Sequence, residues 1–198
     1  MLEEKREKFK KLEEIMGKFF SKFFTPNQYT LISLLFVIIS FSFLINLNLV
    51  LALIFFLLAG LLDFIDGAVA RFLQKATKKG AYLDTISDRY VEGIILLGFL
   101  FLPLPAFLLS AKVWIFLALF GSFLTTYSKA AAKEKEIVTE ELKKGFLTRA
   151  ERIILITLAM VLGIFNFSWL LYPIIILAIF SNITALQRIY LSLRPGQN

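Results

Sequence analysis

The sequence predicts an all-α integral membrane protein with six transmembrane helices and an N-terminal amphipathic helix in the membrane interface. The 198-residue chain is 58% hydrophobic and has a mean hydropathy of +0.76, too apolar for the polar shell of a soluble domain. Its apolar stretches recur in lengths near the roughly 20 residues that cross a bilayer. We therefore expect two parts, a juxtamembrane helix at 1–24 and a six-helix membrane domain at 25–198.

The juxtamembrane segment interleaves charged residues with hydrophobic ones at spacings of three and four. This pattern is typical of a helix that lies on a membrane surface. A cleaved targeting peptide fits less well, because the segment is rich in acidic residues and lacks a small-residue cleavage site. Thr25-Pro26-Asn27 then ends this helix and supplies capping residues for the next one.

The membrane domain contains six apolar segments. We place them at 28–47, 49–73, 81–103, 108–132, 148–166 and 168–191. The turns between the first and second, third and fourth, and fifth and sixth segments are short and nearly uncharged, whereas the loops at 75–79 and 133–152 are basic. Of the 22 Lys and Arg residues, only Lys112 falls on the side of the short turns. The positive-inside rule therefore places both termini and both basic loops in the cytoplasm.

Four aspartates interrupt the second and third predicted spans. Asp63 and Asp66 are three residues apart, and Asp84 and Asp88 are four apart, so each pair lies on one face of its helix. The two helices are antiparallel neighbours joined by a short loop, which brings both pairs to a similar depth. Carboxylates are costly in hydrocarbon, and four of them repel one another. One or two divalent cations would offset this cost, and all-oxygen ligation suits Mg²⁺ or Mn²⁺, with Ca²⁺ as an alternative.

The composition limits which side chains can act as metal ligands or catalysts. The chain contains neither Cys nor His, which excludes thiolate ligands, a cysteine nucleophile and imidazole catalysis. Acid–base chemistry then falls to carboxylate, lysine or tyrosine. The same composition, with Lys and Glu concentrated in the polar segments, is typical of thermophilic proteins.

The residues around the aspartates suit a phosphate-bearing ligand as well as a cation. Gly67 and Ala70 are small and share the aspartate face, which leaves room beside the acids. Arg71 continues this face towards the cytoplasm, where its fork of donors suits a phosphate. Together they form the motif Asp63-x2-Asp66-Gly67-x2-Ala70-Arg71-x8-Gly80-x3-Asp84-x3-Asp88.

This motif resembles the signature of the CDP-alcohol phosphotransferase family, with eight positions at fixed spacing within 26 residues. The resemblance implies a homodimeric transferase in which Asp63, Asp66, Asp84 and Asp88 hold Mg²⁺ or Mn²⁺, two ions in all, against the pyrophosphate of a CDP-linked lipid. It also implies that Asp88 is the general base for an acceptor hydroxyl and that CMP leaves. The residues that it implies for contact with the CDP portion are Asn27, Gln28, Tyr29, Thr30, Gly67, Arg71 and Thr77.

Three basic residues lie at predicted cytoplasmic helix ends, namely Lys129, Arg149 and Arg188. They are similar to the Lys and two Arg that hold the phosphate of inositol phosphate in the phosphatidylinositol-phosphate synthase branch and its archaeal ether-lipid counterpart. The alternative is that they are ordinary positive-inside anchors. We expect Arg152 to pair with Glu151 or with lipid rather than with a substrate.

The resemblance thus implies transfer of an archaetidyl group from CDP-archaeol to inositol phosphate in phospholipid biosynthesis. We expect an ether-lipid donor because the composition is typical of thermophiles and because of the character of the N-terminal region. Within the family, a diacyl-lipid donor, glycerol phosphate as acceptor, and a soluble CDP-inositol donor that makes a phosphodiester solute remain open. Outside it, a cation transporter is disfavoured, because such sites lie at the midplane between inverted repeats. A scaffold whose aspartates form ion pairs with Arg71, Arg89 or nearby lysines is the structural alternative.

Overall fold

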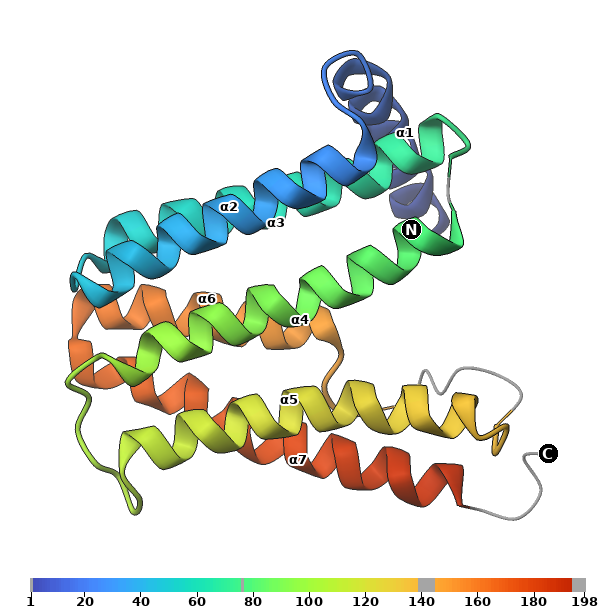
Figure 1. The fold of residues 1–198 in the computed structure, drawn as a ribbon. Coiled ribbons are helices and arrows are strands. Elements are labelled where there is room, and N and C mark those ends of the chain that lie inside the picture. Colours follow the sequence, from blue (N-terminus) through green and yellow to red (C-terminus); the bar gives the residue numbers. More distant parts are fainter. Residues whose placement is uncertain (1, 76, 139–144, 194–198) are drawn as a thin grey trace. The chain divides into compact units, whose positions relative to one another are not determined.

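The computed structural model describes residues 2–75, 77–138 and 145–193, and within these ranges it is helical and contains no strand (Figure 1). The elements are α1 (Leu2–Phe20), α2 (Pro26–Ile45), α3 (Leu49–Phe72), α4 (Lys78–Leu100), α5 (Ala111–Glu134), α6 (Arg149–Phe165), the 3-10 helix η1 (Phe167–Leu170) and α7 (Leu171–Ser192). The chain forms two compact units, one of Met1–Phe43 with Leu51–Ile94 and one of Leu44–Val50 with Ile95–Asn198.

Each of the six segments predicted to span the membrane coincides with a helix. The largest offset is three residues, at both ends of α4, which is predicted at 81–103 and observed at Lys78–Leu100, and at the starts of α5 and α7. The loop predicted to be basic at 133–152 falls in part on 139–144, outside the described residues. The prediction of an all-α chain is therefore confirmed.

Four helical segments in the described part of the chain are long and apolar enough to cross a membrane. They are Pro26–Ile45, Leu49–Phe72, Ala111–Glu134 and Phe167–Ser192. α4 is not among them because it carries Asp84, Asp88, Arg89 and Glu92, and α6 is not among them because it has only 17 residues. The four apolar segments make the chain an integral membrane protein.

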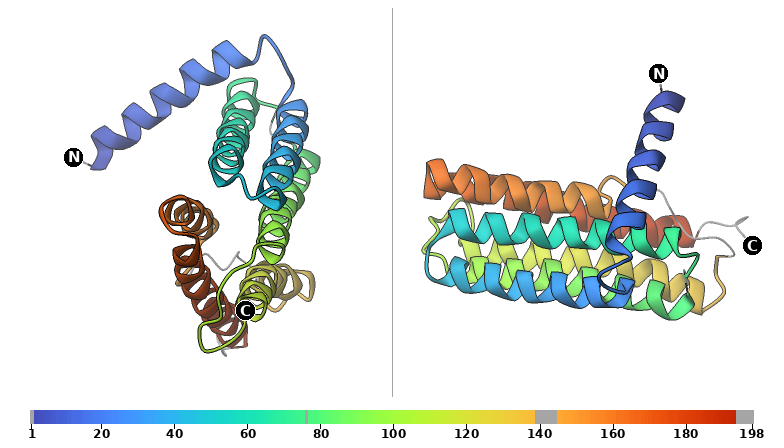
Figure 2. Two further views of the ribbon diagram at one scale, coloured as in Figure 1. Left: turned by 90° about the vertical axis from the view of Figure 1, so that its left-hand side faces the viewer. Right: turned by 90° about the horizontal axis from the view of Figure 1, so that it is seen from above.

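In the first unit, α2 and α3 lie side by side and antiparallel (Figures 1 and 2). The Ser40 hydroxyl donates to the Ala52 carbonyl oxygen at 2.7 Å and joins the two helices. The ring of Phe55 on α3 stacks between Phe36 and Phe43 on α2, with ring centroids 5.6 and 5.4 Å away. These contacts fix the register in which α2 presents its first turns to α3.

α1 runs across the direction of α2 and α3 (Figure 2). The crossing is close, because a Cβ added at Gly17 would lie only 2.6 Å from the Ala68 carbonyl oxygen. Met16 and Phe20 pack against a buried cluster of Tyr29, Ile65 and Val69. The Tyr29 hydroxyl donates to the Phe20 carbonyl oxygen at 2.9 Å, so the end of α1 is tied to the start of α2.

In the second unit, α5 and α7 pack tightly against each other. Gly121 on α5 makes this packing close, since a Cβ there would lie 2.5 Å from the Ser181 hydroxyl. The Asn182 side-chain amide on α7 donates to the Leu117 carbonyl oxygen on α5 at 2.8 Å. α6 begins with a capping box in which Thr148 and Glu151 exchange side-chain and backbone hydrogen bonds.

Candidate active site

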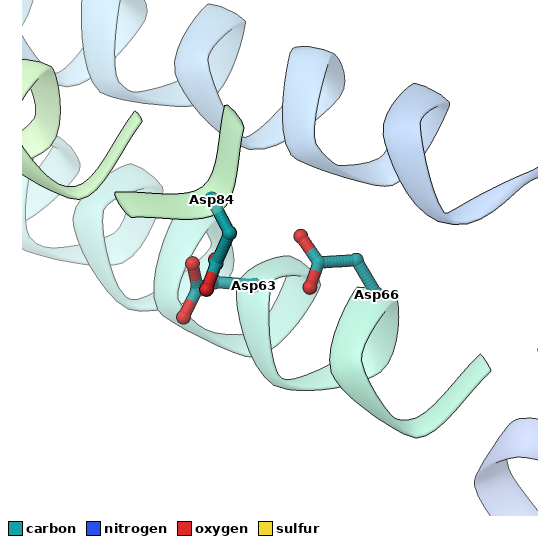
Figure 3. A group of neighbouring side chains, drawn as sticks. All are labelled: Asp63, Asp66 and Asp84. Atoms are coloured by element: carbon teal, nitrogen blue, oxygen red, sulfur yellow. The ribbon is translucent and has the colours of Figure 1, made fainter. Parts of the chain in front are cut away.

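Three aspartate carboxylates converge in the first unit. Asp63 and Asp66 extend from α3 and Asp84 from α4, and their side chains point toward one another (Figure 3). Each offers one oxygen, and these oxygens all lie within 4.8 Å of one another. Asp66 is buried, and the other two are half-buried. The i, i+3 spacing on α3 and the short connection to α4 therefore bring together three acids from two helices.

The three carboxylates fit a divalent cation. Neighbouring oxygen ligands on one Mg²⁺ at about 2.1 Å lie about 3 Å apart, so these oxygens would have to approach one another by at most about 2 Å to share a single ion. Asp88 follows one turn after Asp84 on α4, is 8% exposed, and lies outside the group of three. Asp63, Asp66 and Asp84 could thus hold one cation, with Asp88 as a neighbouring carboxylate.

A threonine on α2 contacts this centre. The Thr30 hydroxyl donates to Asp66 Oδ2 at 2.7 Å. Both side chains are nearly buried, with 8% of Thr30 and 7% of Asp66 exposed. From the family resemblance, Thr30 is expected to contact the CDP portion, so its bond to a metal-site carboxylate is an additional role.

A pocket of about 520 Å³ opens beside the aspartates. Its lining comes from the start of α2, the end of α3 and the start of α4, with Thr25, Pro26, Asn27, Thr30, Asp66, Gly67, Ala70, Arg71, Lys75, Thr77, Gly80, Ala81 and Asp84. Five of the residues expected to contact CDP therefore line it, namely Asn27, Thr30, Gly67, Arg71 and Thr77.

Gln28 and Tyr29, the other two residues expected to contact CDP, do not line this pocket. The Gln28 side-chain oxygen accepts from the Thr25 backbone N–H at 2.8 Å and from the Thr25 hydroxyl at 3.0 Å, which closes the turn that leads into α2. Tyr29 is 3% exposed and lies in the cluster that packs against α1. These two residues hold the start of α2 in place while their neighbours Asn27 and Thr30 face the pocket.

Arg71 and Gly67 share one wall of the pocket. Arg71 folds back over the preceding turn, so that a Cβ at Gly67 would lie 3.2 Å from Arg71 Nη1. Arg71 Nη2 also forms an ion pair with Glu13 Oε1 on α1 at 3.1 Å. The glycine thus gives the guanidinium room to lie along the pocket rather than away from it.

Thr77 shapes the opposite rim by capping α4. Its hydroxyl oxygen accepts from the Gly80 backbone N–H at 3.0 Å. This bond satisfies one of the free donors at the helix N-terminus. It also explains why α4 begins at Lys78, three residues before the predicted start of the span.

The structural alternative assigned Arg71 and Arg89 to the aspartates as ion-pair partners. In the structure Arg71 pairs with Glu13, and Arg89 Nη1 pairs with Glu92 Oε2 at 2.9 Å. Glu92 is fully buried on the α4 turn that follows Asp88. Each of these two arginines therefore forms an ion pair with a glutamate.

The basic residues expected to bind the acceptor belong to the second unit. Arg188 on α7 is 9% exposed, and its Nη1 donates to the Thr125 carbonyl oxygen on α5 at 2.8 Å. Lys129 follows Thr125 by one turn on α5, and Arg149 opens α6. Thr125 thus anchors Arg188 on the α5 face that also carries Lys129.

Of the two partners expected for Arg152, Glu151 and lipid, the structure excludes lipid. Arg152 is 3% exposed, and its Nη1 donates to the Thr125 hydroxyl oxygen at 3.2 Å, so it does not extend to lipid. The Glu151 carboxylate accepts from the Thr148 backbone N–H. Arg152 and Arg188 therefore meet at Thr125 from two different helices. The helical spacing was a signal for this, because Arg152 lies on the same buried stripe of α6 as Ile156.

Similarity to known proteins extends over most of the chain. The sequence model of the family described as CDP-alcohol phosphatidyltransferase matches residues 23–185. The archaetidylinositol phosphate synthase of Pyrococcus horikoshii is 34% identical over 192 residues, which cover 96% of this chain and 95% of that protein. The bifunctional IPC transferase and DIPP synthase of Aquifex aeolicus is 34% identical over 174 residues, but these cover 85% of this chain and only 39% of that protein.

Solved structures show the same fold. The phosphatidylinositol phosphate synthase of Mycobacterium tuberculosis in complex with manganese and citrate has a TM-score of 0.78 and 26% sequence identity, covering 92% of this chain and 90% of that one. The same enzyme with CDP-DAG bound also has a TM-score of 0.78, at 24% identity, covering 93% and 95% of the two chains.

Proposed function

Because this chain belongs to the CDP-alcohol phosphatidyltransferase family, we propose that it moves an archaetidyl group from a CDP-linked lipid to inositol phosphate and releases CMP. The observation that carries this proposal is the convergence of Asp63, Asp66 and Asp84 at the edge of a pocket that also contains Arg71. The choice of lipid and acceptor is supported by a similarity that runs along almost the full length of an archaetidylinositol phosphate synthase.

On the donor side, Asp63, Asp66 and Asp84 would hold a divalent cation, Mg²⁺ or Mn²⁺, and Asp88 would be available to a second one. When bound, the cations neutralise the diphosphate and the charge that develops on the leaving CMP. Arg71 supplies a donor fork for the same diphosphate. The pocket walls around Asn27, Thr30, Gly67 and Thr77 contact the rest of the CDP portion, while Gln28 and Tyr29 keep the start of α2 in position.

The reaction needs one proton acceptor. The acceptor hydroxyl oxygen forms a bond to the β-phosphorus, the bond from that phosphorus to the bridging oxygen breaks, and CMP leaves with the electron pair. Asp88 takes the hydroxyl proton, because the chain contains no histidine and a carboxylate is the base at hand. Lys129, Arg149 and Arg188 hold the phosphate of the acceptor.

In this proposal the membrane domain has six spans, with α4 and α6 added to the four apolar segments. α6 with 17 residues is about 26 Å long, close to the roughly 30 Å hydrocarbon core. The charged residues of α4 all lie before Gly93, and the rest of the helix is apolar. α1 lies in the interface, both termini and the active site face the cytoplasm, and the enzyme is a homodimer.

The absence of cysteine makes this topology directly testable. Single cysteines at Lys75 and Lys135 should react with a membrane-impermeant maleimide only after the cells are opened. A cysteine at Asn48 should react in intact cells. Labelling of all three positions from the same side would contradict the six-span topology.

The function is tested by incubating the purified protein with CDP-archaeol, Mg²⁺ and inositol phosphate and measuring CMP. Glycerol phosphate and free inositol serve as competing acceptors, and CDP-diacylglycerol as a competing donor. We expect CMP release with inositol phosphate and CDP-archaeol. Turnover of glycerol phosphate with no turnover of inositol phosphate would show that the acceptor is wrong.

The similarity to part of a bifunctional IPC transferase and DIPP synthase favours a second candidate, a soluble CDP-inositol donor in place of the CDP-lipid. Both candidates use the same aspartates and the same pocket. They differ in whether the alcohol attached to CDP is a lipid. CMP release from CDP-inositol, with none from CDP-archaeol, would favour this second activity.

A further inference from the structure

The hydrogen bond between Thr30 and Asp66 joins two helices at the metal centre. Thr30 Oγ1 lies 2.7 Å from Asp66 Oδ2 and 3.2 Å from the Pro26 carbonyl oxygen. A hydroxyl carries one proton, and the shorter distance is typical of a charge-assisted bond to a carboxylate. The proton therefore goes to Asp66, and this bond fixes one of the two carboxylate oxygens.

The segment that carries Thr30 is itself held firmly. The Gln28 side-chain oxygen accepts from both the backbone N–H and the hydroxyl of Thr25 at the first turn of α2, and the Tyr29 hydroxyl donates to the Phe20 carbonyl oxygen of α1. A β-branched threonine in a helix also has few side-chain rotamers. The donor that Asp66 meets is therefore fixed by the fold rather than recruited when a ligand binds.

We propose that Thr30 is a positioning residue of the metal centre, which orients Asp66 so that its carboxylate can share a divalent cation with Asp63 and Asp84. This inference deepens the proposed function and rests on it for the identity of the reaction. Carboxylate ligands are commonly held by such outer hydrogen bonds, and removal of one typically weakens metal binding by about 10- to 100-fold. Asp66 is the most buried of the three acids, so its orientation is the one that the surrounding protein controls most.

The same bond couples the metal centre to the nucleotide side of the pocket. Thr30 lies three residues after Asn27, and both line the pocket from α2, whereas Asp66 lines it from α3. Loss of the Thr30 hydroxyl should therefore weaken metal binding and raise the KM for the CDP-linked donor. The KM for the acceptor should stay unchanged.

The test is Mn²⁺ binding to the purified full-length protein without substrates, measured by electron paramagnetic resonance. Thr30→Val keeps the shape of the side chain and removes the hydroxyl, and we expect it to raise the Kd for Mn²⁺ by about 10- to 100-fold. Thr30→Ser keeps the hydroxyl and should stay within about threefold of the parent protein. Thermal unfolding in EDTA checks that each variant is folded.

Ser33 offers a matched control on the same helix. It is buried like Thr30, but its hydroxyl donates to the Thr30 carbonyl oxygen at 2.8 Å rather than to an aspartate. Ser33→Ala should bind Mn²⁺ like the parent protein.

Parent-like Mn²⁺ affinity in folded Thr30→Val, or equal weakening in Thr30→Ser and Thr30→Val, would overturn the positioning role. If Mn²⁺ binding depends on the Thr30 hydroxyl but no CDP-linked donor yields CMP, the positioning role stands and the proposed function fails.

Discussion

Arg71 on α3 and Glu13 on α1 form an ion pair, with 3.1 Å between Arg71 Nη2 and Glu13 Oε1. The pair joins the N-terminal helix to the rim of the pocket in which Arg71 is proposed to hold the donor diphosphate. The side chains are 56% and 26% exposed, so the pair is worth at most about 1 kcal/mol. Glu13 therefore competes weakly with a diphosphate for the same guanidinium.

Glu13→Gln should lower the KM for the CDP-linked donor by up to about fivefold, because it removes a competitor worth at most about 1 kcal/mol. The effect should shrink as salt is added, since both side chains are partly exposed. Steady-state kinetics at low and high ionic strength measure it. Glu14→Gln, one residue along α1, is the control and should change nothing. A raised KM in Glu13→Gln would show that Glu13 helps donor binding instead.

Gly67→Ala should raise the KM for the donor by about tenfold while the protein stays folded. The added Cβ would lie 3.2 and 3.3 Å from the two terminal nitrogens of Arg71, and the flexible guanidinium would move out of the pocket. Gly60→Ala on the same helix is a matched control, because a Cβ there meets nothing within 4 Å. Similar donor KM values in both variants would contradict this role of Gly67.

Arg149→Ala should raise the KM for inositol phosphate by about tenfold or more and leave binding of the CDP-linked donor almost unchanged. The expected cause is the loss of a phosphate-binding guanidinium. Initial rates with each substrate varied in turn separate the two effects. Lys135→Ala removes an exposed cation near the end of α5 and should have no effect. A change confined to the donor KM would count against the acceptor site.

Thr125→Val should destabilise the second unit by about 1 to 3 kcal/mol, because it leaves a buried Arg152 donor without its hydroxyl acceptor. The valine also removes the bond from the Thr125 hydroxyl to the Ser122 carbonyl oxygen. Thermal unfolding in detergent measures the loss. Thr125→Ser should recover most of it. Equal melting temperatures for the valine variant and the parent would show that Arg152 does not depend on this bond.

Helix positions could be predicted from the sequence because hydrophobic run length and capping motifs are local signals. Thr25 and Gln28, like Thr148 and Glu151, follow the Thr-x-x-Gln/Glu pattern of a capping box, and the helices begin one residue after each threonine. The convergence of Asp63, Asp66 and Asp84 is also nearly local, since helical spacing and one short loop bring them together.

The contacts missed by the sequence analysis are long-range. Thr30 and Asp66 are 36 residues apart, and Glu13 and Arg71 are 58 apart. Their contact depends on how α1 and α2 pack against α3. One residue gave a hint of that packing, because α1 carries a glycine, Gly17, at the point where it crosses Ala68. The family resemblance implied CDP contacts for all four residues from Asn27 to Thr30, whereas a helix sends consecutive residues to different faces.

In the proposed function, Asp63, Asp66 and Asp84 hold the divalent cation that donor cleavage requires. The most direct test is CMP release from CDP-archaeol and inositol phosphate as Mn²⁺ is added back to EDTA-treated protein. We expect no CMP before the addition, full recovery in the parent protein, and at most about 1% of that rate in folded Asp84→Asn. CMP release by the metal-free protein, or a parent rate in Asp84→Asn, would show that these aspartates do not hold a cation that the reaction requires.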